Sequence, residues 1–98
     1  MRNEWYRSTK RVLAYRLPEG LDPRKAEAKK QWPRWMTDAY AVGIIKDSVL
    51  RPALEVLGEK ILVKLAPPGS WIVRSSRYRA DVLSDKKFND KYEIDIDG

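Results

Sequence analysis

Cysteine and histidine are both missing from this chain of 98 residues. Without cysteine there is no disulfide framework and no thiolate nucleophile. Without histidine the chain lacks the side chain best suited to proton transfer near neutral pH, and the usual ligand sets for zinc, copper and iron are incomplete. These absences exclude the ordinary catalytic triads, so we expect a protein without catalytic activity, cofactor or bound metal.

Long apolar runs are also missing. No stretch approaches the roughly 18–20 apolar residues that a membrane-spanning helix needs. Residues 1–10 are polar and aromatic and contain no apolar core of a secretory signal. We therefore expect a cytosolic protein that does not contact a membrane.

The chain does contain enough large apolar groups to fold. Hydrophobic residues make up 43% of it, including four tryptophans and five tyrosines, which is too many for a disordered chain. A chain of this length has room for one hydrophobic core. We expect one domain over residues 1–98, with possible fraying over residues 1–9 and 94–98.

Positive charge is concentrated in the first third of the chain. The net charge is +6; residues 1–34 hold ten Lys and Arg against four Asp and Glu, whereas residues 35–98 hold ten of each. Such a distribution suits an anionic partner, either nucleic acid or an acidic protein surface. An uneven but merely solvated surface explains it equally well.

The first half of the chain predicts one strand and two helices. Residues 11–17 are rich in strand formers that alternate between two faces. Asp22 followed by Pro23 predicts a helix start, with a short helix through about residue 30. A second helix is expected to begin at Pro33 and stop near Gly43, packing through one face. That face carries Trp32, Trp35, Met36 and Ala39.

The second half predicts two hairpins and a closing helix. Residues 54–64 suggest two short strands around Gly58, and residues 71–74 and 78–82 suggest two more after a proline-containing loop. Ser84 is expected to cap a helix over residues 85–92. Helices set apart from antiparallel strands indicate an α+β fold. We expect an antiparallel sheet of about four to six short strands with two or three short helices.

Aromatic and basic residues lie together near the N-terminus. Rings among cations are what a groove for single-stranded nucleic acid needs, because bases stack on rings while Lys and Arg follow phosphates. Tryptophan in a small domain is, however, more often part of the core, with the cations on a solvated helix face. The candidate binding residues here are Trp5, Arg7, Lys10, Arg11, Lys29, Lys30 and Arg34, with Trp32 and Trp35 as candidate stacking rings.

A second cluster contains Arg74, Arg77 and Arg79, which surround two serines in the second predicted hairpin. Arginine can bind a carboxylate or phosphate through two parallel hydrogen bonds, and binding residues concentrate on loops. The alternative is an edge hairpin that its charges keep soluble. We include all three arginines among the candidate binding residues.

Several short motifs resemble a family of small uncharacterised tailed-bacteriophage and prophage proteins. They are residues 68–74 (PGSWIVR), Tyr78 and residues 88–93 (FNDKYE), which resemble the family's P-G-D-W-[IV]-[IV] strand, its tyrosine and its closing F-x-x-x-Y-E. Residues 11–16, 33–36 and 57–58 also follow the family's order. The resemblance implies phage origin and action in the cytoplasm of the infected bacterial host, without implying a reaction.

Two departures from the family pattern concern charge. Ser70 stands where the family has aspartate, and residues 76–79 (SRYR) replace its G-E-x-Y-P element with a basic version. If the family uses that turn as a contact surface, this chain has changed the surface charge. The motif is also explained as structure alone, because Pro-Gly sets a turn and alternating apolar residues fit a sheet.

Together these observations predict a non-catalytic phage accessory protein that binds and inhibits a host factor. The expected partner is a bacterial protein or protein–nucleic acid complex, such as a CRISPR effector or another defence component. The basis is that arginines and exposed aromatics are good interface anchors. Two alternatives stay open: an accessory protein that binds nucleic acid directly, and a structural or assembly component of the phage.

Overall fold

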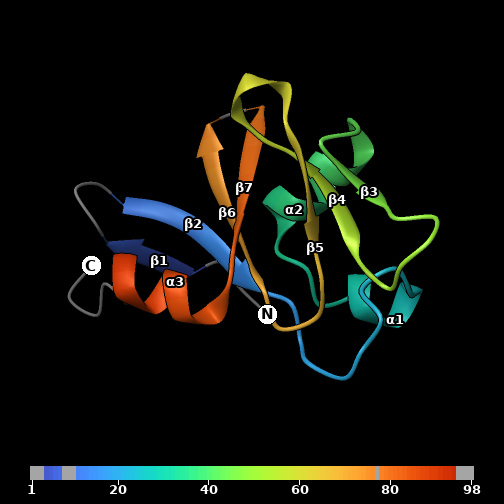
Figure 1. Cartoon of the computed structure of the whole chain (residues 1–98), viewed down its shortest axis with the longest axis horizontal. Coiled ribbons are helices and arrows are strands. Elements are labelled where there is room, and N and C mark those ends of the chain that lie inside the picture. Colours follow the sequence, from blue (N-terminus) through green and yellow to red (C-terminus); the bar gives the residue numbers. More distant parts are fainter. Residues whose placement is uncertain (1–3, 8–10, 77, 95–98) are drawn as a thin grey trace.

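Two antiparallel sheets and three helices form the described chain, shown in Figure 1. The computed structural model describes residues 4–7, 11–76 and 78–94. The α+β class predicted from the sequence is confirmed, with the strands divided between two sheets. The elements are β1 (Glu4–Arg7), β2 (Arg11–Arg16), α1 (Ala26–Lys29), α2 (Arg34–Ala41), β3 (Ile45–Asp47), β4 (Leu54–Leu57), a 3-10 turn (Glu59–Ile61), β5 (Val63–Ala66), β6 (Trp71–Ser76), β7 (Arg79–Leu83), α3 (Asp85–Lys91) and β8 (Glu93–Ile94).

Strand β2 is at the centre of the larger sheet, whose order is β7-β6-β2-β1-β8; the smaller sheet has the order β3-β4-β5. The alternation predicted for β2 is confirmed on both faces. Val12 and Ala14 are buried on one face, and Tyr15 and Leu17 are buried on the other. The larger sheet therefore separates two hydrophobic clusters, which its two faces help to form.

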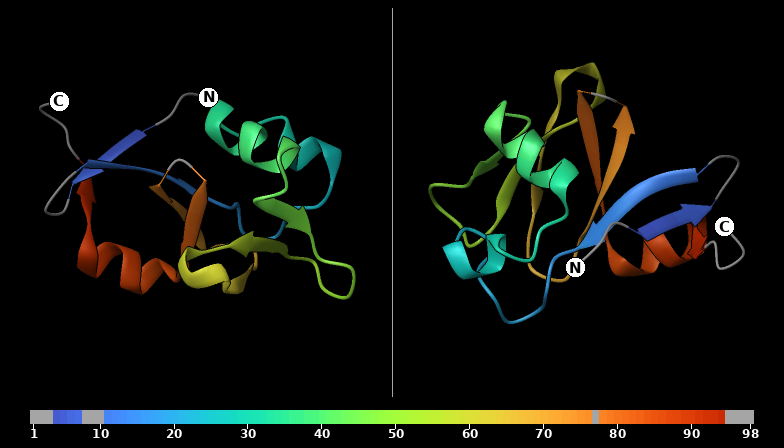
Figure 2. Two further views of the ribbon diagram at one scale, coloured as in Figure 1. Left: turned by 90° about the horizontal axis from the view of Figure 1, so that it is seen from above. Right: turned by 180° about the vertical axis from the view of Figure 1, so that it is seen from behind.

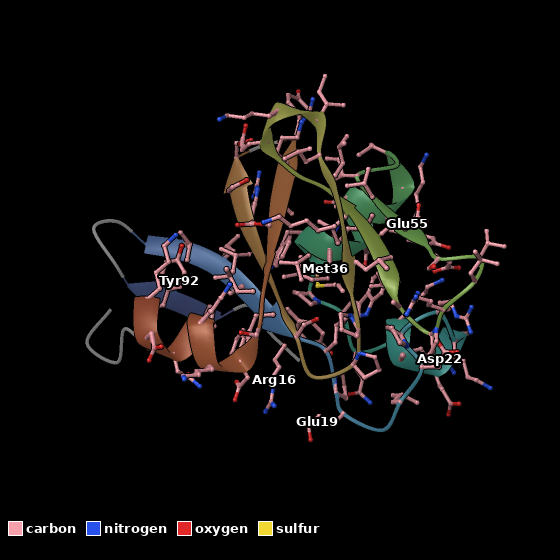
Figure 3. All side chains as sticks on the ribbon, in the orientation of Figure 1. Arg16, Glu19, Asp22, Met36, Glu55 and Tyr92 are labelled. Carbon is pink, nitrogen blue, oxygen red and sulfur yellow. The ribbon has the colours of Figure 1, made fainter. Side chains whose placement is uncertain are left out.

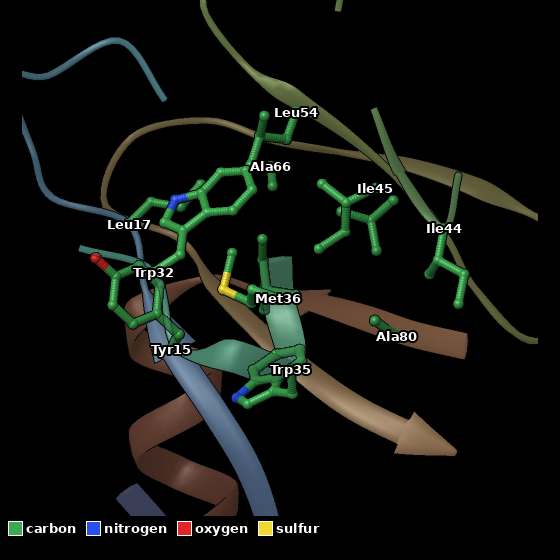
Figure 4. Close-up of a cluster of buried hydrophobic side chains, with 12 residues drawn as sticks. Tyr15, Leu17, Trp32, Trp35, Met36, Ile44, Ile45, Leu54, Ala66 and Ala80 are labelled. Atoms are coloured by element: carbon green, nitrogen blue, oxygen red, sulfur yellow. The ribbon is translucent and has the colours of Figure 1, made fainter. Parts of the chain in front are cut away.

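The larger cluster lies between one face of this sheet, the smaller sheet and α2 (Figure 4). Met36 and Leu54 are fully buried there, and Trp32 and Trp35 are 7% and 8% exposed. The helix face predicted from the sequence thus packs inward as expected. Gly43 ends this helical segment with a φ of +88°, in the left-handed region that glycine adopts without a steric penalty.

The smaller cluster lies under α3 on the opposite face of the larger sheet (Figure 2). Phe88 is 1% exposed and contacts Val73 and the rings of Trp71 and Tyr92. Ser84 caps the helix as predicted, its side-chain oxygen accepting a hydrogen bond from the backbone N–H of Lys87. None of the described helices is long and apolar enough to cross a bilayer.

Two short strands lie at or beside the segments that were expected to fray. Residues 4–7, placed in a segment expected to fray, form β1, in which Trp5 pairs with Leu13 of β2. Glu93 and Ile94 form β8, which pairs with β1. The backbone hydrogen bonds of these ladders hold both segments in the larger sheet. Residues 1–3, 8–9 and 95–98 of the two segments expected to fray lie outside the described residues.

The first helix starts later than predicted. Its N-cap is Lys25, and Asp22 instead accepts hydrogen bonds from the backbone and side chain of Arg24. Asp is a strong turn former because its carboxylate can bind the backbone two residues on, and here that local bond replaces the capping role. Arg24 also donates to the carbonyl oxygen of Ser48, which fixes the turn against the β3–β4 connection.

This turn makes stability depend on pH. The hydrogen bonds from Arg24 lower the pKa of Asp22 from 3.8 to about 2. A carboxyl whose pKa is lowered by folding contributes stability that is fully present above its unfolded value and is lost as pH falls through its folded value. For D22N we expect a lower urea midpoint than the native chain at pH 6 and convergence of the two midpoints near pH 2. A difference that stays constant from pH 6 to pH 2 would contradict this assignment.

Candidate binding pocket

A cavity of about 300 Å³ lies between α2 and the β6–β7 hairpin. Its apolar side is continuous with the larger core, because Trp35, Ile44 and Ala80 belong to both. Its polar rim comes mainly from the hairpin that the sequence singled out for its arginines. The rim residues are Asp38, Arg74, Ser76, Tyr78 and Arg79, and Ala39 and Val42 complete the lining. We call this cavity the α2–hairpin pocket.

A β-bulge positions the rim. Arg74 pairs with Ala80, but Ser76 pairs with Arg79, so the register shifts by one residue between the two pairs. In a regular strand, consecutive residues point to opposite faces. Bulges re-aim side chains, and here Arg79 and Ala80 line the same cavity although they are neighbours in sequence.

Positive charge dominates this rim. Arg74 makes no ion pair or side-chain hydrogen bond within the described chain, and Arg79 donates to the carbonyl oxygen of Tyr78 at 2.7 Å. Asp38, the only acidic residue of the lining, lies 3.7 Å from Arg34 one helical turn earlier. Both guanidinium groups therefore keep donors for an incoming anion, beside an apolar floor.

The pocket suits binding better than proton transfer. Arginine stays protonated at physiological pH and supplies only donors. A ligand that combines an apolar group with a carboxylate or phosphate matches the floor and the rim at once, and the volume is at the lower end of the range for ligand sites. Within the described residues no three acidic side chains gather where they could hold a metal ion.

The structure brings two of the predicted hairpin residues together, Arg74 and Arg79. Arg77 and Lys10 lie outside the described residues. Trp5 and Arg7 are in β1, and Arg11 is the first residue of β2. In the order of the larger sheet, β6 lies between β2 and β7, so β1 and β2 are separated by β6 from the strand that carries Arg79.

Lys29 is part of a partly exposed network of side chains, separate from the pocket. Its Nζ lies 2.9 Å from Oδ1 of Asp47 and donates to the hydroxyl of Tyr40 at 3.0 Å. The Tyr40 hydroxyl in turn donates to Asp47. Burial lowers the pKa of Lys29, but the hydrogen bonds to Tyr40 and Asp47 outweigh it and raise the pKa above 10.5. The side chain thus joins α1 to α2 and β3.

The burial of Trp32 and Trp35 bears on their predicted role as rings on which bases would stack. Trp32 and Trp35 lie in the larger core and are 7% and 8% exposed, so neither ring is presented on an open surface on which bases could stack. Lys30 and Arg34 are exposed and keep their predicted role as candidate cations. Direct binding of nucleic acid stays a prediction, now without these two rings.

Comparisons of the chain with protein-family models, with curated proteins and with solved structures find no match. The pocket therefore has to be interpreted from its own chemistry. Sequence analysis missed Asp38 and Val42 as lining residues. Each follows Trp35 or Ala39 by three residues, and this spacing indicates that the side chains share one face of the helical segment. The spacing does not indicate that this face borders a cavity beside the β6–β7 hairpin, because that depends on the tertiary fold.

Proposed function

We propose that the protein is a non-catalytic binding protein that captures a partner protein through the α2–hairpin pocket. The observation that supports this is the pairing of two arginines, Arg74 and Arg79, with an apolar floor formed by Trp35, Ile44 and Ala80. Interface energy concentrates where aromatic or apolar anchors fill a water-free pocket and charged groups around it find partners. This pocket offers both conditions in one place.

The same arrangement defines the chemistry of the partner. The segment that enters would carry a large apolar side chain with a carboxylate beside it, so that the apolar group occupies the floor and the carboxylate accepts hydrogen bonds from the rim. Tyr78 is 59% exposed next to the two arginines and adds an amphipathic ring to the contact surface.

The setting comes from the resemblance to small phage and prophage proteins. In that setting the partner is a factor of the bacterial host, and binding inhibits it by occupying a surface that the factor needs. A component of a defence system, such as a CRISPR effector, is the kind of target that we propose. Three residues of the turn that differs from the family pattern, Ser76, Tyr78 and Arg79, line the pocket, so the change in charge falls on the proposed contact surface.

A capture experiment from bacterial lysate tests the proposal. The tagged protein is compared with R74E/R79E and with K86E/K87E, which makes the same charge change on exposed residues of α3. After nuclease treatment, we expect the native chain and the α3 variant to retain one protein at a stoichiometric ratio. The pocket variant should retain at least about tenfold less, because reversing both charges of the rim replaces two attractions to the partner's carboxylate by repulsions.

Two results would oppose the proposal. If no protein is retained stoichiometrically from any host lysate, capture of a host factor is wrong. If capture depends on nucleic acid and disappears after nuclease treatment, the alternative of direct nucleic-acid binding takes its place. That alternative is then checked by fluorescence anisotropy with labelled DNA and RNA, where binding must weaken steeply with salt.

A further inference from the structure

The outer face of the smaller sheet is apolar and uncovered. Helices α1 and α2 lie on one side of β3, β4 and β5, and no helix of the described chain lies on the other (Figures 1 and 2). Val63 and Leu65 of β5 are 59% and 43% exposed on that outer side. Val49 and Leu50, in the adjoining β3–β4 connection, are 87% and 92% exposed. We call this surface the outer sheet face.

Two shallow hollows show that these side chains form one continuous surface. Leu65 lines a hollow of about 240 Å³ together with Val49 and Leu50. Val63 lines a second, of about 100 Å³, together with Leu57. Glu55 lines both hollows. Val49, Leu50 and Leu65 therefore lie on one side of this carboxylate, and Leu57 and Val63 lie on the other.

The charges of the outer sheet face are self-complementary. Lys46 and Glu55 are opposite each other in the β3–β4 register, and Glu55 is labelled in Figure 3. Neither side chain makes an ion pair or a side-chain hydrogen bond within the described residues. A two-fold axis through this face would bring Lys46 of each copy toward Glu55 of the other. An isologous interface requires this kind of symmetry, because the same patch must match itself.

The size of the apolar surface fits a weak dimer. The exposed parts of the four most exposed side chains amount to roughly 250 Å² of apolar area, taking the usual area of an aliphatic side chain. A small interface buries about 600 Å² per partner, somewhat more than half of it apolar. The apolar part of the outer sheet face is therefore roughly three quarters of the apolar share of such an interface, which is why we expect a weak association.

We propose that the outer sheet face is an interface between two copies of this chain, which associate as a two-fold symmetric dimer. Leu50, Val63 and Leu65 of each copy are buried against the other, and Lys46 of each pairs with Glu55 of the other. Ile44 lines both the smaller hollow and the α2–hairpin pocket, so the two surfaces meet at this residue. Leu50 and Leu65 lie at the other hollow, away from the pocket, so the variants at Leu50 test dimerisation separately from partner capture. Arg51 also lines the larger hollow, so Glu55 lies between two cations, Lys46 and Arg51. The exposed apolar side chains around this carboxylate make the face less suited to an acidic partner than the rim of the pocket.

Sedimentation equilibrium over a wide concentration range tests the dimer directly. We expect a monomer–dimer equilibrium with a Kd on the order of 10–100 µM for the native chain. L50D should shift it to the monomer, because it places a carboxylate in the apolar contact. This variant should fold normally, since Leu50 is almost fully exposed and lies in a connection.

A charge exchange supplies the sharper control. K46E should weaken the dimer about tenfold or more, and K46E/E55K should restore it, because the exchange returns opposite charges to the two positions that the interface pairs. Lys46 and Glu55 are also opposite each other within one chain, so the urea midpoint of each variant is measured beside its dimer Kd. R74E/R79E should dimerise like the native chain, and L50D should keep the capture activity. A monomeric mass up to about 1 mM, or a dimer unaffected by both L50D and K46E, would overturn the proposal.

Discussion

Replacing Phe88 by alanine is expected to lower the free energy of unfolding by about 3–5 kcal/mol. The ring is 1% exposed and stacks on Trp71 with 3.8 Å between ring centroids. Tyr92 covers its other side at 5.1 Å. Truncation removes the apolar transfer energy and leaves a cavity that the rigid strands cannot close. Since a domain of this size has a total stability of about 5–15 kcal/mol, the variant loses a large fraction of it, and its urea midpoint should fall far below that of the native chain.

Urea denaturation followed by tryptophan fluorescence measures this loss. F88L is the matched control, because it keeps most of the volume and loses only the ring stacking; its cost should stay below about 1.5 kcal/mol. The difference between the two variants isolates the cavity from the aromatic contact. If F88A lost less than about 1 kcal/mol, α3 would not be packed on the larger sheet as described.

Replacing Lys29 by methionine should destabilise the protein by about 1–2 kcal/mol. The substitution keeps most of the side-chain volume but leaves the Asp47 carboxylate with Tyr40 as its remaining side-chain donor. Breaking a fully buried ion pair costs about 3–5 kcal/mol. Here the Lys29 and Asp47 side chains are 22% and 36% exposed, so solvent screening reduces the loss.

Lys30 is the natural control, because it is the next residue, carries the same charge and is exposed. K30M should change the urea midpoint very little. K29M/D47N should recover part of the loss from K29M, since it removes the unpaired charge. Equal midpoints for K29M and K30M would show that the network contributes nothing. Comparison of K29M with K30M also separates stability from binding. Both variants remove one positive charge, but only K29M removes a contact between helices α1 and α2, so a loss of nucleic-acid binding in K29M alone indicates an effect of packing.

Local rules predicted much of the fold. The alternation of residues in β2 indicates its apolar face, and the spacing of Trp32, Trp35 and Met36 indicates the apolar face of the helical segment. In the folded chain these apolar side chains pack in the larger cluster. Ser84 and Gly43 act through bonds and dihedral angles within a few residues, so their roles are also visible in sequence. The hairpins around Gly58 and after Ser76 were predicted because short runs of strand-forming residues flank turn-forming residues there.

The pocket depends on features that sequence patterns do not carry. A bulge between Arg74 and Ser76 changes which hairpin side chains face α2, and its position is set by the packing of two strands. The division of the strands into two sheets was not predicted either. The alternation of residues in a strand indicates which of its faces is apolar, but it does not indicate that β3 and β5 pair with β4. For Asp22, two local signals competed, and the turn prevailed over the cap.

The central position of β2 determines the order in which the protein can fold. Its partner β6 lies far along the chain, and Ala14 pairs with Val73. During synthesis β2 therefore has only β1 beside it until residues 71–76 have emerged, whereas α2, β3, β4 and β5 lie close together in sequence and can assemble earlier. Loop closure over such a separation slows folding, so the larger sheet and its cover α3 should be the last parts to form.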